Sequence, residues 1–239
     1  MFLNYLKIKN KLFRKKCCFC NKKVDSENIL CNECKKALKI YSESKKCALC
    51  NRSISQTEAV MCSYCRKLSP SFDQAIALYS YKDVFEKTLL DLKFQKRYSK
   101  IVPISKLMVE QFEKMNVKCD FIVPVPTVLN NYISRDYCSS CEMAYRIGKE
   151  CSVKVYDNML IKKKAVQQSA LKFEERYENV KGMYGFNKRY KDVTKGKNIL
   201  LVDDVITSGA TLSECARVLK ENGAARVYAV CLLYGGDMK

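Results

Sequence analysis

The feature that most constrains this chain is a set of four Cys-x-x-Cys pairs within its first 65 residues. A Cys-x-x-Cys turn directs two thiolates at one point, and tetrahedral zinc is held where two such turns face each other. The unit is duplicated, because CFCN and LCNEC are echoed by CALCN and MCSYC. The protein has no histidine, so a zinc site here is all-sulfur or includes a carboxylate. The pairs are Cys17/Cys20, Cys31/Cys34, Cys47/Cys50 and Cys62/Cys65.

The spacing predicts two structural zinc ions, since a site filled by four thiolates leaves no open position for water or substrate. It does not say which pairs combine, and reduced structural thiols or redox pairs are the alternative. Cys18 is left over beside Cys17 and is a competing ligand. The segments between the pairs are too short and polar to bury a core of their own. We therefore expect each zinc site to be a small, separate folding unit stabilised by its metal.

Composition and charge limit the class of protein. A chain of 239 residues with 48% hydrophobic content can bury the core of one large or two smaller domains. No apolar run approaches the ~18 residues that a membrane span needs, and the basic N-terminus lacks the pattern of a signal peptide. We expect a cytoplasmic protein that does not span the membrane. The formal charge of +19 favours a polyanionic partner such as nucleic acid, although solubility alone accounts for part of such a charge.

After residue 69 the sequence alternates between strand and helix patterns. This order predicts an α/β fold with a doubly wound parallel sheet. We divide the chain into a Cys-rich double zinc ribbon with a basic N-terminal segment, residues 1–69, and a sheet domain, residues 70–239. Residues 162–182 are charged and poor in bulky apolar side chains, which is typical of a mobile loop. Residues 72–82 indicate a β-hairpin or an edge strand. The other expected strands cover 120–126, 183–186, 198–205 and 226–234, and the expected helices 84–94, 102–115, 135–151 and 211–223.

Two adjacent aspartates, Asp203 and Asp204, follow the buried strand NILLV and precede a loop of small and hydroxylated residues. In open α/β sheets ligands bind beyond the carboxyl ends of the strands. The N-terminus of the following helix favours an anion, most naturally a phosphate. Two carboxylates beside a phosphate site repel each other and the phosphate. The arrangement is explained if the vicinal hydroxyls of a sugar bridge the carboxylates and Mg²⁺ offsets their negative charge. An accidental polar turn before a helix is the alternative.

The segment LLVDDVITSGATL resembles the 5-phosphoribosyl-1-pyrophosphate (PRPP) signature of type I phosphoribosyltransferases. In that family the adjacent acidic residues hold the ribose hydroxyls and the loop holds the 5-phosphate. The order of a Cys-rich head, a Pro-Val-Pro segment, QxxLxxxxRxxNVxG and this loop resembles the ComF family over almost the whole chain. The resemblance implies a phosphoribosyltransferase-like sheet domain behind a double zinc ribbon. The implied PRPP-binding residues are Asp203, Asp204, Thr207, Ser208, Gly209, Ala210 and Thr211.

The resemblance also implies a pyrophosphate-binding loop and a flexible loop that closes over the ligand. This chain departs from the family after the Pro-Val-Pro segment, where Asp136 stands in a Gly position and Cys138 in an Asn position. The departures fall where pyrophosphate would be contacted, so they weaken the case for turnover more than the case for ligand binding. The implied pyrophosphate-loop residues are Pro124, Val125, Pro126 and Arg135, and those of the flexible loop are Gln168, Arg176 and Asn179.

Three functions compete. The resemblance favours an accessory protein of natural transformation that binds PRPP and single-stranded DNA during DNA uptake, at the inner face of the membrane. Single-stranded DNA needs a positive groove with aromatic platforms, for which KFQKRYSK and NKRYK are candidates, while a solvated face is the alternative for each. A working phosphoribosyltransferase acting on a nitrogenous acceptor is the second function, with Asp204 or another carboxylate as base. The third is an adaptor whose zinc head docks a helicase or membrane channel. The DNA candidates are Arg97, Tyr98, Arg189 and Tyr190.

Overall fold

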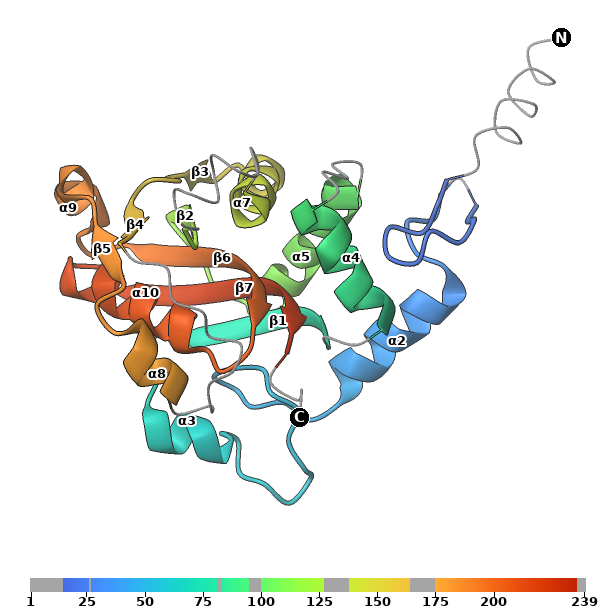
Figure 1. Ribbon diagram of the computed structural model, residues 1–239, viewed down its shortest axis with the longest axis horizontal. Helices are drawn as coiled ribbons and strands as arrows, with labels where there is room; N and C mark the ends of the chain where they lie inside the picture. Colours follow the sequence, from blue (N-terminus) through green and yellow to red (C-terminus); the bar gives the residue numbers. More distant parts are fainter. Residues whose placement is uncertain are drawn as a thin grey trace, which may run out of the picture.

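A five-stranded parallel sheet forms the centre of the protein (Figure 1). The structure is a computed structural model that describes residues 15–25, 27–80, 83–94, 100–126, 138–163 and 175–235. The strand order is β1-β7-β6-β2-β3, and all four pairings are parallel. This confirms the predicted α/β class. The strands are β1 (Gln74–Ser80), β2 (Phe121–Pro124), β3 (Lys154–Val155), β6 (Asn198–Ile206) and β7 (Arg226–Tyr234).

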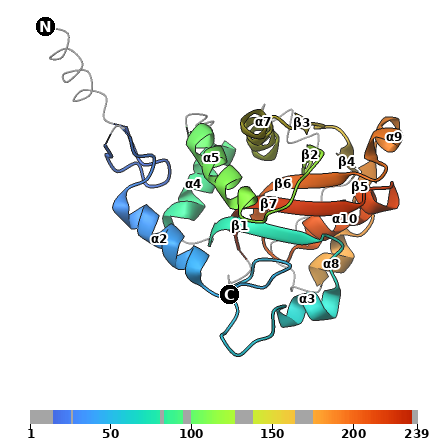
Figure 2. The same ribbon diagram turned by 180° about the vertical axis from the view of Figure 1, so that it is seen from behind.

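Helices cover both faces of the sheet, and each face has its own core. One face carries α4 (Asp83–Phe94), α5 (Ile101–Glu113) and α7 (Ser139–Cys151); the other carries α8 (Glu175–Val180) and α10 (Ala210–Glu221) (Figures 1 and 2). Successive strand residues alternate between the two cores, as the pleat requires. The unbroken apolar runs of β6 and β7 follow from this burial on both faces.

The cysteine-rich head is divided between these two cores. Its helices are α2 (Asn32–Glu43) and α3 (Ser63–Leu68). The first cysteine unit packs with the core under α4 and α5, and the second packs with the core under α10. The head units therefore share apolar contacts with the sheet, whereas the sequence indicated separate folding units. The domain boundary between residues 69 and 70 stays a prediction.

The second cysteine unit covers the outer edge of β1. The Ala75 amide donates to the Leu49 carbonyl at 2.7 Å, and the Ala77 amide donates to Asn51 Oδ1 at 3.0 Å. Tyr41 Oη also donates to Asn51 Oδ1, at 3.2 Å. An uncovered edge strand presents unpaired amides that invite pairing with other chains. The turn after Cys50 therefore closes this side of the sheet.

The first cysteine unit is anchored through one carbonyl on the opposite face. The Phe19 carbonyl accepts hydrogen bonds from Thr88 Oγ1 at 3.0 Å and from Lys100 Nζ at 3.2 Å. Lys100 is also paired with Asp91 at 3.1 Å, and both side chains are buried. The Phe19 ring meets those of Tyr79 and Phe85 edge-on, a favourable aromatic geometry. A buried ion pair needs such extra partners to offset its loss of water.

A small antiparallel pair of strands stands beside the main sheet. It joins β4 (Leu160–Lys162) to β5 (Tyr184–Phe186), and the short helices η2 (Lys188–Tyr190) and α9 (Lys191–Thr194) follow. The expected strand at 183–186 is confirmed as β5, whereas β3 and β4 were not predicted. Of the expected mobile loop, residues 164–174 lie outside the described residues. Within the described part of the chain, no helix is both long and apolar enough to cross a membrane.

Candidate functional site

Asp203 and Asp204 lie on β6 just beyond the point where its neighbour β2 ends. The pairing of β2 with β6 ends at Pro124 opposite Val202, while β6 itself continues to Ile206 alongside β7. The two half-buried carboxylates therefore stand at the carboxyl-end rim of the sheet, beyond the pairing of β6 with β2. This is the edge at which α/β proteins bind ligands.

The two carboxylates point to opposite sides of the sheet, which explains how adjacent negative charges are tolerated. On the α7 side, Ser139 Oγ donates to Asp204 Oδ2 at 3.2 Å. On the α10 side, burial, reinforced by the negative charge of Asp203, raises the pKa of the Cys215 thiol. Asp203 Oδ1 also accepts a hydrogen bond from the Asp204 amide at 2.8 Å. Successive strand side chains alternate in this way, so the two carboxylates stand on opposite sides of the end of β6.

The loop between β6 and α10 turns tightly at Gly209. This residue has a φ of +81° and is the N-cap of α10. A Cβ atom added here would lie 3.4 Å from the Phe72 ring and 3.5 Å from the Tyr177 hydroxyl. Positive φ is costly for residues with a Cβ. The first turn of α10 contains no acidic residue, so the partial positive charge at its N-terminus is not neutralised locally.

Ser208 is held by hydrogen bonds to its side-chain hydroxyl and to its carbonyl. Its Oγ accepts the Ala210 amide at 3.3 Å, and its carbonyl accepts the Tyr177 hydroxyl at 3.2 Å. Ser208 is buried, while Thr207 and Thr211 are half-buried. Tyr177, which sequence reasoning missed, thus connects α8 to this loop. The predicted loop residues 207–211 lie between the end of β6 and the first turn of α10, and their contact with a ligand stays a prediction.

The first turn of α7 ties the ends of β2 and β6 together. Ser140 Oγ donates to the Val125 carbonyl at 2.9 Å, and its neighbour Ser139 bonds Asp204. The Val125 amide in turn donates to the Val202 carbonyl at 2.9 Å. Sequence reasoning missed both serines, although the CSSC stretch soon after Pro-Val-Pro was an available signal. Arg135 of the predicted pyrophosphate loop lies outside the described residues.

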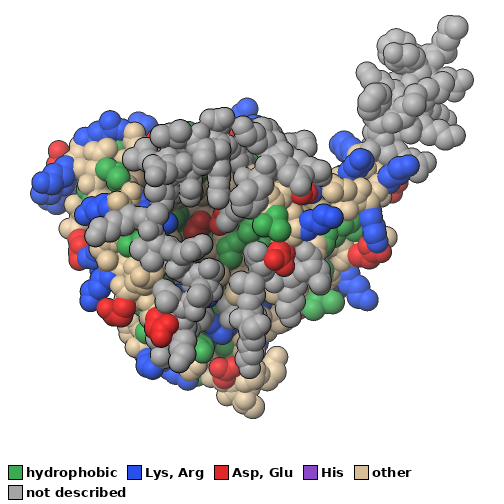
Figure 3. Space-filling view, in the orientation of Figure 1, with side chains coloured by type: hydrophobic (Ala, Val, Ile, Leu, Met, Phe, Trp, Pro, Cys, Tyr) green, Lys and Arg blue, Asp and Glu red, His purple; other side chains and the backbone are tan. Residues whose placement is uncertain are grey.

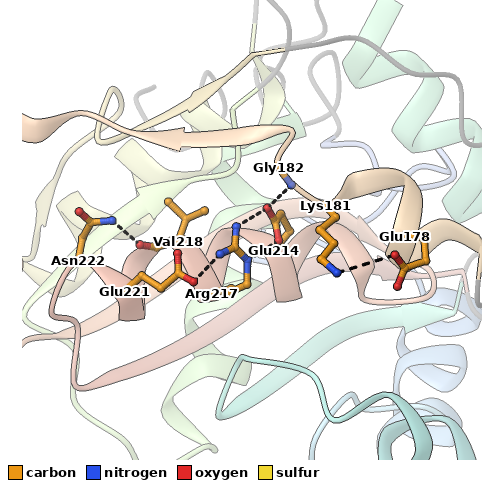
Figure 4. A network of polar contacts seen from close by, with 8 residues as sticks. All are labelled: Glu178, Lys181, Gly182, Glu214, Arg217, Val218, Glu221 and Asn222. Atoms are coloured by element: carbon orange, nitrogen blue, oxygen red, sulfur yellow. Dashed lines mark hydrogen bonds and ion pairs between the residues drawn. The ribbon is translucent and has the colours of Figure 1, made fainter.

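A polar network fixes the end of the predicted flexible loop to α10 (Figure 4). Glu214 Oε1 accepts the Gly182 amide at 2.7 Å, and both Glu214 oxygens accept from Arg217 at 2.7 Å. Burial raises the pKa of Glu214, but these donors outweigh it and leave the pKa lowered. Arg176 and Asn179 lie on α8, just before this anchor. Gln168 lies outside the described residues.

The eight predicted cysteine ligands form two groups with metal-site geometry. Cys17, Cys20, Cys31 and Cys34 form one, Cys47, Cys50, Cys62 and Cys65 the other, and in each the sulfurs lie within 4.8 Å of one another. Tetrahedral zinc with Zn–S bonds of about 2.3 Å places its sulfurs roughly 3.8 Å apart, so both groups fit the metal. The pairing that spacing left open is therefore first with second and third with fourth. Cys18 does not belong to the group that contains its neighbour Cys17, and burial raises the pKa of the Cys18 thiol to about 12.

A second cluster combines cationic and aromatic side chains near η2. The rings of Tyr156 and Tyr190 lie 5.2 Å apart between centroids. Arg189 Cζ lies 4.6 Å from the Tyr190 centroid, and Lys154 Nζ lies 4.7 Å from that of Tyr156. Both cations are exposed, and Figure 3 shows blue side chains gathered where α9 lies in Figure 1. Arg97 and Tyr98, the other DNA candidates, lie outside the described residues.

Comparison with known proteins places these sites in a family. The phosphoribosyl transferase domain family matches residues 152–239. Competence protein F of Haemophilus influenzae is 22% identical over 209 residues, covering 84% of this chain and 89% of that protein. The DNA utilization protein YhgH of Escherichia coli K12 is 23% identical over 211 residues, covering 85% and 89%. Over most of its length the chain is similar to these competence and DNA utilization proteins, in agreement with the ComF-like order of its motifs.

The domain match and the similarity to these relatives cover different shares of the chain. The matched transferase region contains the aspartate pair, the Gly209 loop and the α10 N-terminus, and the homology extends over most of the chain. Among solved structures, the glutamine PRPP amidotransferase of B. subtilis aligns with a TM-score of 0.40 and 19% identity, covering 60% of this chain and 30% of that chain.

Proposed function

We propose that this protein binds PRPP at the end of β6 and single-stranded DNA on its basic surface, and that it assists DNA uptake in natural transformation. The observation that carries the PRPP proposal is the pair of half-buried carboxylates beside the tight loop that opens α10. Its relatives are named for competence and DNA utilization, which supports the uptake role. The protein would act at the cytoplasmic side of the membrane.

The ribose and the 5-phosphate of PRPP each have matching groups at this rim. Asp203 and Asp204 accept hydrogen bonds from the ribose hydroxyls, and the amides around Gly209 with the hydroxyls of Thr207 and Thr211 hold the 5-phosphate. Mg²⁺ bound with PRPP offsets the negative charge that phosphates and carboxylates bring together. Carboxylate oxygens are ligands this cation prefers, and the aspartate pair would supply them. These contacts make the binding depend on ribose rather than on phosphate alone.

A series of sugar phosphates tests the proposal. Ribose 5-phosphate should bind, and 2-deoxyribose 5-phosphate should bind about 10-fold to 100-fold more weakly, since it lacks a hydrogen bond to a charged acceptor. Calorimetry in Mg²⁺ measures both affinities. In an Asp203→Ala/Asp204→Ala variant the difference between the sugars should vanish. Equal affinities in the wild-type protein would show that the carboxylates do not hold the ribose hydroxyls.

Turnover is a separate question from binding. The chain contains a phosphoribosyltransferase-type domain, and transfer to a nitrogenous acceptor would release pyrophosphate. The segment that should stabilise the leaving pyrophosphate departs from the family at Asp136 and Cys138. We therefore expect ligand binding without fast turnover. Release of pyrophosphate at several turnovers per second with a nitrogenous base or amine would favour the transferase function instead.

The cluster at Tyr156 and Tyr190 supports the DNA proposal. Bases stack on aromatic rings without regard to sequence, and nearby cations meet the phosphates. Arg189 Nη2 donates to Tyr190 Oη at 2.6 Å, and that hydroxyl in turn donates to Asn158. These contacts hold the ring and the guanidinium in a fixed arrangement. Lys188 and Lys191 flank them and are exposed, so the surface is basic as well as aromatic.

Salt dependence tests the DNA site. The logarithm of the affinity for an oligothymidylate should fall with the logarithm of salt concentration, at about −0.7 per phosphate neutralised. The Lys188→Glu/Arg189→Glu variant should flatten this slope. Its matched control is Lys36→Glu/Lys39→Glu on α2, at the opposite end of the molecule (Figure 1). An equal loss in both variants would deny the cluster a specific role.

Absence of DNA binding even at low salt would favour the adaptor function. The head would then dock a helicase or channel of the uptake machinery, and the basic surface would serve solubility or that protein partner.

A further inference from the structure

The first turn of α7 carries a second kind of cysteine pair. Cys138 and Cys141 form a disulfide, and they are separate from the two zinc-type groups. Ser139 and Ser140 lie between them in the sequence, and these serines donate hydrogen bonds to Asp204 at the end of β6 and to Val125 just after β2. The pair stands where the ComF pattern has a different sequence, so the family resemblance does not account for it.

The disulfide constrains the same turn that positions the ribose-binding rim. Ser139 Oγ reaches Asp204 Oδ2 at 3.2 Å, and Ser140 Oγ reaches the Val125 carbonyl at 2.9 Å. Cys138 Sγ also lies 3.2 Å from Ser140 Oγ. Two thiols need more room than two bonded sulfurs. Reduction removes the bond that fixes this spacing and leaves the first turn of α7 free to widen, and the serines lie on that turn.

We propose that Cys138 and Cys141 are a reversible redox site whose disulfide holds Ser139 on Asp204 and keeps the ribose-binding rim in its binding geometry. The effect on ribose-phosphate affinity rests on the proposed PRPP function, whereas the redox site itself does not. Its reductant is a cellular thiol, and its oxidant is the corresponding disulfide. The oxidised form binds ribose phosphates more tightly than the reduced form.

The exchange chemistry is balanced and has a preferred direction of attack. Both cysteines are buried, so exchange requires local opening of the first turn of α7. A thiolate then attacks Cys141 Sγ and forms a mixed disulfide, and Cys138 Sγ leaves as a thiolate that takes up a proton. A second thiol then attacks the external sulfur of the mixed disulfide and releases Cys141 as a thiol. Two thiols are oxidised to one disulfide, and two electrons and two protons reach the protein. Cys138 is the better leaving group because it accepts the Cys141 amide at 3.3 Å and is the N-cap of α7.

The other cysteines outside the zinc-type groups are free thiols. Burial raises the pKa of Cys18 to about 12 and that of Cys119 to about 11, and burial, with nearby negative charge, also raises that of Cys151. Cys215 and Cys231 are fully buried in the core. Thiols with raised pKa values exchange slowly. Cys119 and Cys151 are therefore suitable control positions.

The test follows the native zinc-loaded protein through a series of glutathione buffers of increasing oxidised fraction. Trypsin places both cysteines in one peptide, residues 136–146, which contains no other cysteine. Alkylation and mass spectrometry should show its two thiols converting together and reversibly to a disulfide. Amide hydrogen exchange at 139–146 and at the end of β6 should be about tenfold faster in the reduced form. Ribose 5-phosphate should bind about fivefold more weakly, the effect of one loosened hydrogen bond.

Variants separate the possible outcomes. Cys138→Ser/Cys141→Ser should behave like the reduced protein in every buffer, and Cys119→Ser/Cys151→Ser should switch like the wild type. Thiols in peptide 136–146 that stay reduced in every buffer would overturn the redox site. A disulfide that forms without changing amide exchange would overturn its coupling to the rim. If disulfide formation slows exchange but neither form binds ribose 5-phosphate, the redox site stands and the PRPP proposal fails.

Discussion

The docking of the second cysteine unit onto β1 can be measured with a matched pair of glycine substitutions. Asn51 and Asn21 occupy equivalent positions after their Cys-x-x-Cys turns, and both have a φ of 62°. The amide of each donates to the carbonyl of the first cysteine of its turn at 3.0 Å. Only Asn51 reaches the sheet, where its Oδ1 accepts the Ala77 amide at 3.0 Å. Asn21 is exposed.

Replacing each asparagine by glycine keeps the left-handed backbone and removes only the side chain. The backbone consequences of glycine, in both the folded and unfolded states, are common to the two variants. Asn51→Gly additionally loses the bonds to Ala77 and Tyr41 and leaves a buried amide without its acceptor. A lost hydrogen bond costs about 1 kcal/mol, and an orphaned buried donor costs about 1 to 3 kcal/mol. Asn51→Gly should therefore be less stable than Asn21→Gly by about 2 to 4 kcal/mol.

The assay is urea unfolding in buffer with excess zinc, so that metal occupancy is equal in all samples. The protein contains no tryptophan, so tryptophan fluorescence cannot serve as the probe. Far-ultraviolet circular dichroism is used instead, because it reports the loss of the sheet and helices. Linear extrapolation gives the free energy of unfolding for each variant. If the two variants agree within about 0.5 kcal/mol, a difference typical of neutral surface changes, then the turn after Cys50 does not hold the β1 edge.

Three further predictions follow from the site and the zinc groups. Metal analysis should give two zinc ions per chain, and fewer than two, with all eight thiols reactive in the native protein, would contradict the zinc assignment. Gly209→Val should block ribose 5-phosphate binding, because φ is +81° and the Phe72 ring is close, whereas Gly196→Val, at a φ of +72° in open space, should retain it. Because the folded-state pKa of Glu214 is lowered, its stabilisation is present above the unfolded pKa of about 4.3 and is lost as pH falls through the folded value. Glu214→Gln should thus flatten the acid side of a plot of urea midpoint against pH, and an unchanged acid side would show that the Glu214–Arg217 contact is not stabilising.

The parallel sheet and the cysteine groups could be predicted because their signals are local in sequence. Continuous apolar runs in β6 and β7 indicated strands buried on both faces, and Cys-x-x-Cys pairs carry their metal geometry in their own spacing. The tight loop at Gly209 was recognisable because a run of small and hydroxylated residues between a strand and a helix is typical of a phosphate-binding turn. In each case the residues that make the feature are neighbours along the chain.

The contacts that join these parts could not be predicted, because they are long-range and use groups common to every residue. The carbonyls of Phe19 and Leu49 anchor the two cysteine units, and every residue offers a carbonyl. The Ser139–Asp204 bond spans 65 positions and depends on the packing of α7 against β6. The short strands β3 and β4 escaped prediction because two or three residues carry too little pattern to distinguish a strand from a loop.

The central claim is that one rim holds a ribose phosphate while a separate basic surface holds single-stranded DNA. The most direct test is to titrate PRPP–Mg²⁺ and an oligothymidylate, separately and together, into the wild-type protein and two variants. Asp203→Ala/Asp204→Ala should lose PRPP binding and keep DNA binding, and Lys188→Glu/Arg189→Glu should do the reverse. Wild-type PRPP affinity in the aspartate variant, with its fold intact by circular dichroism, would contradict the claim.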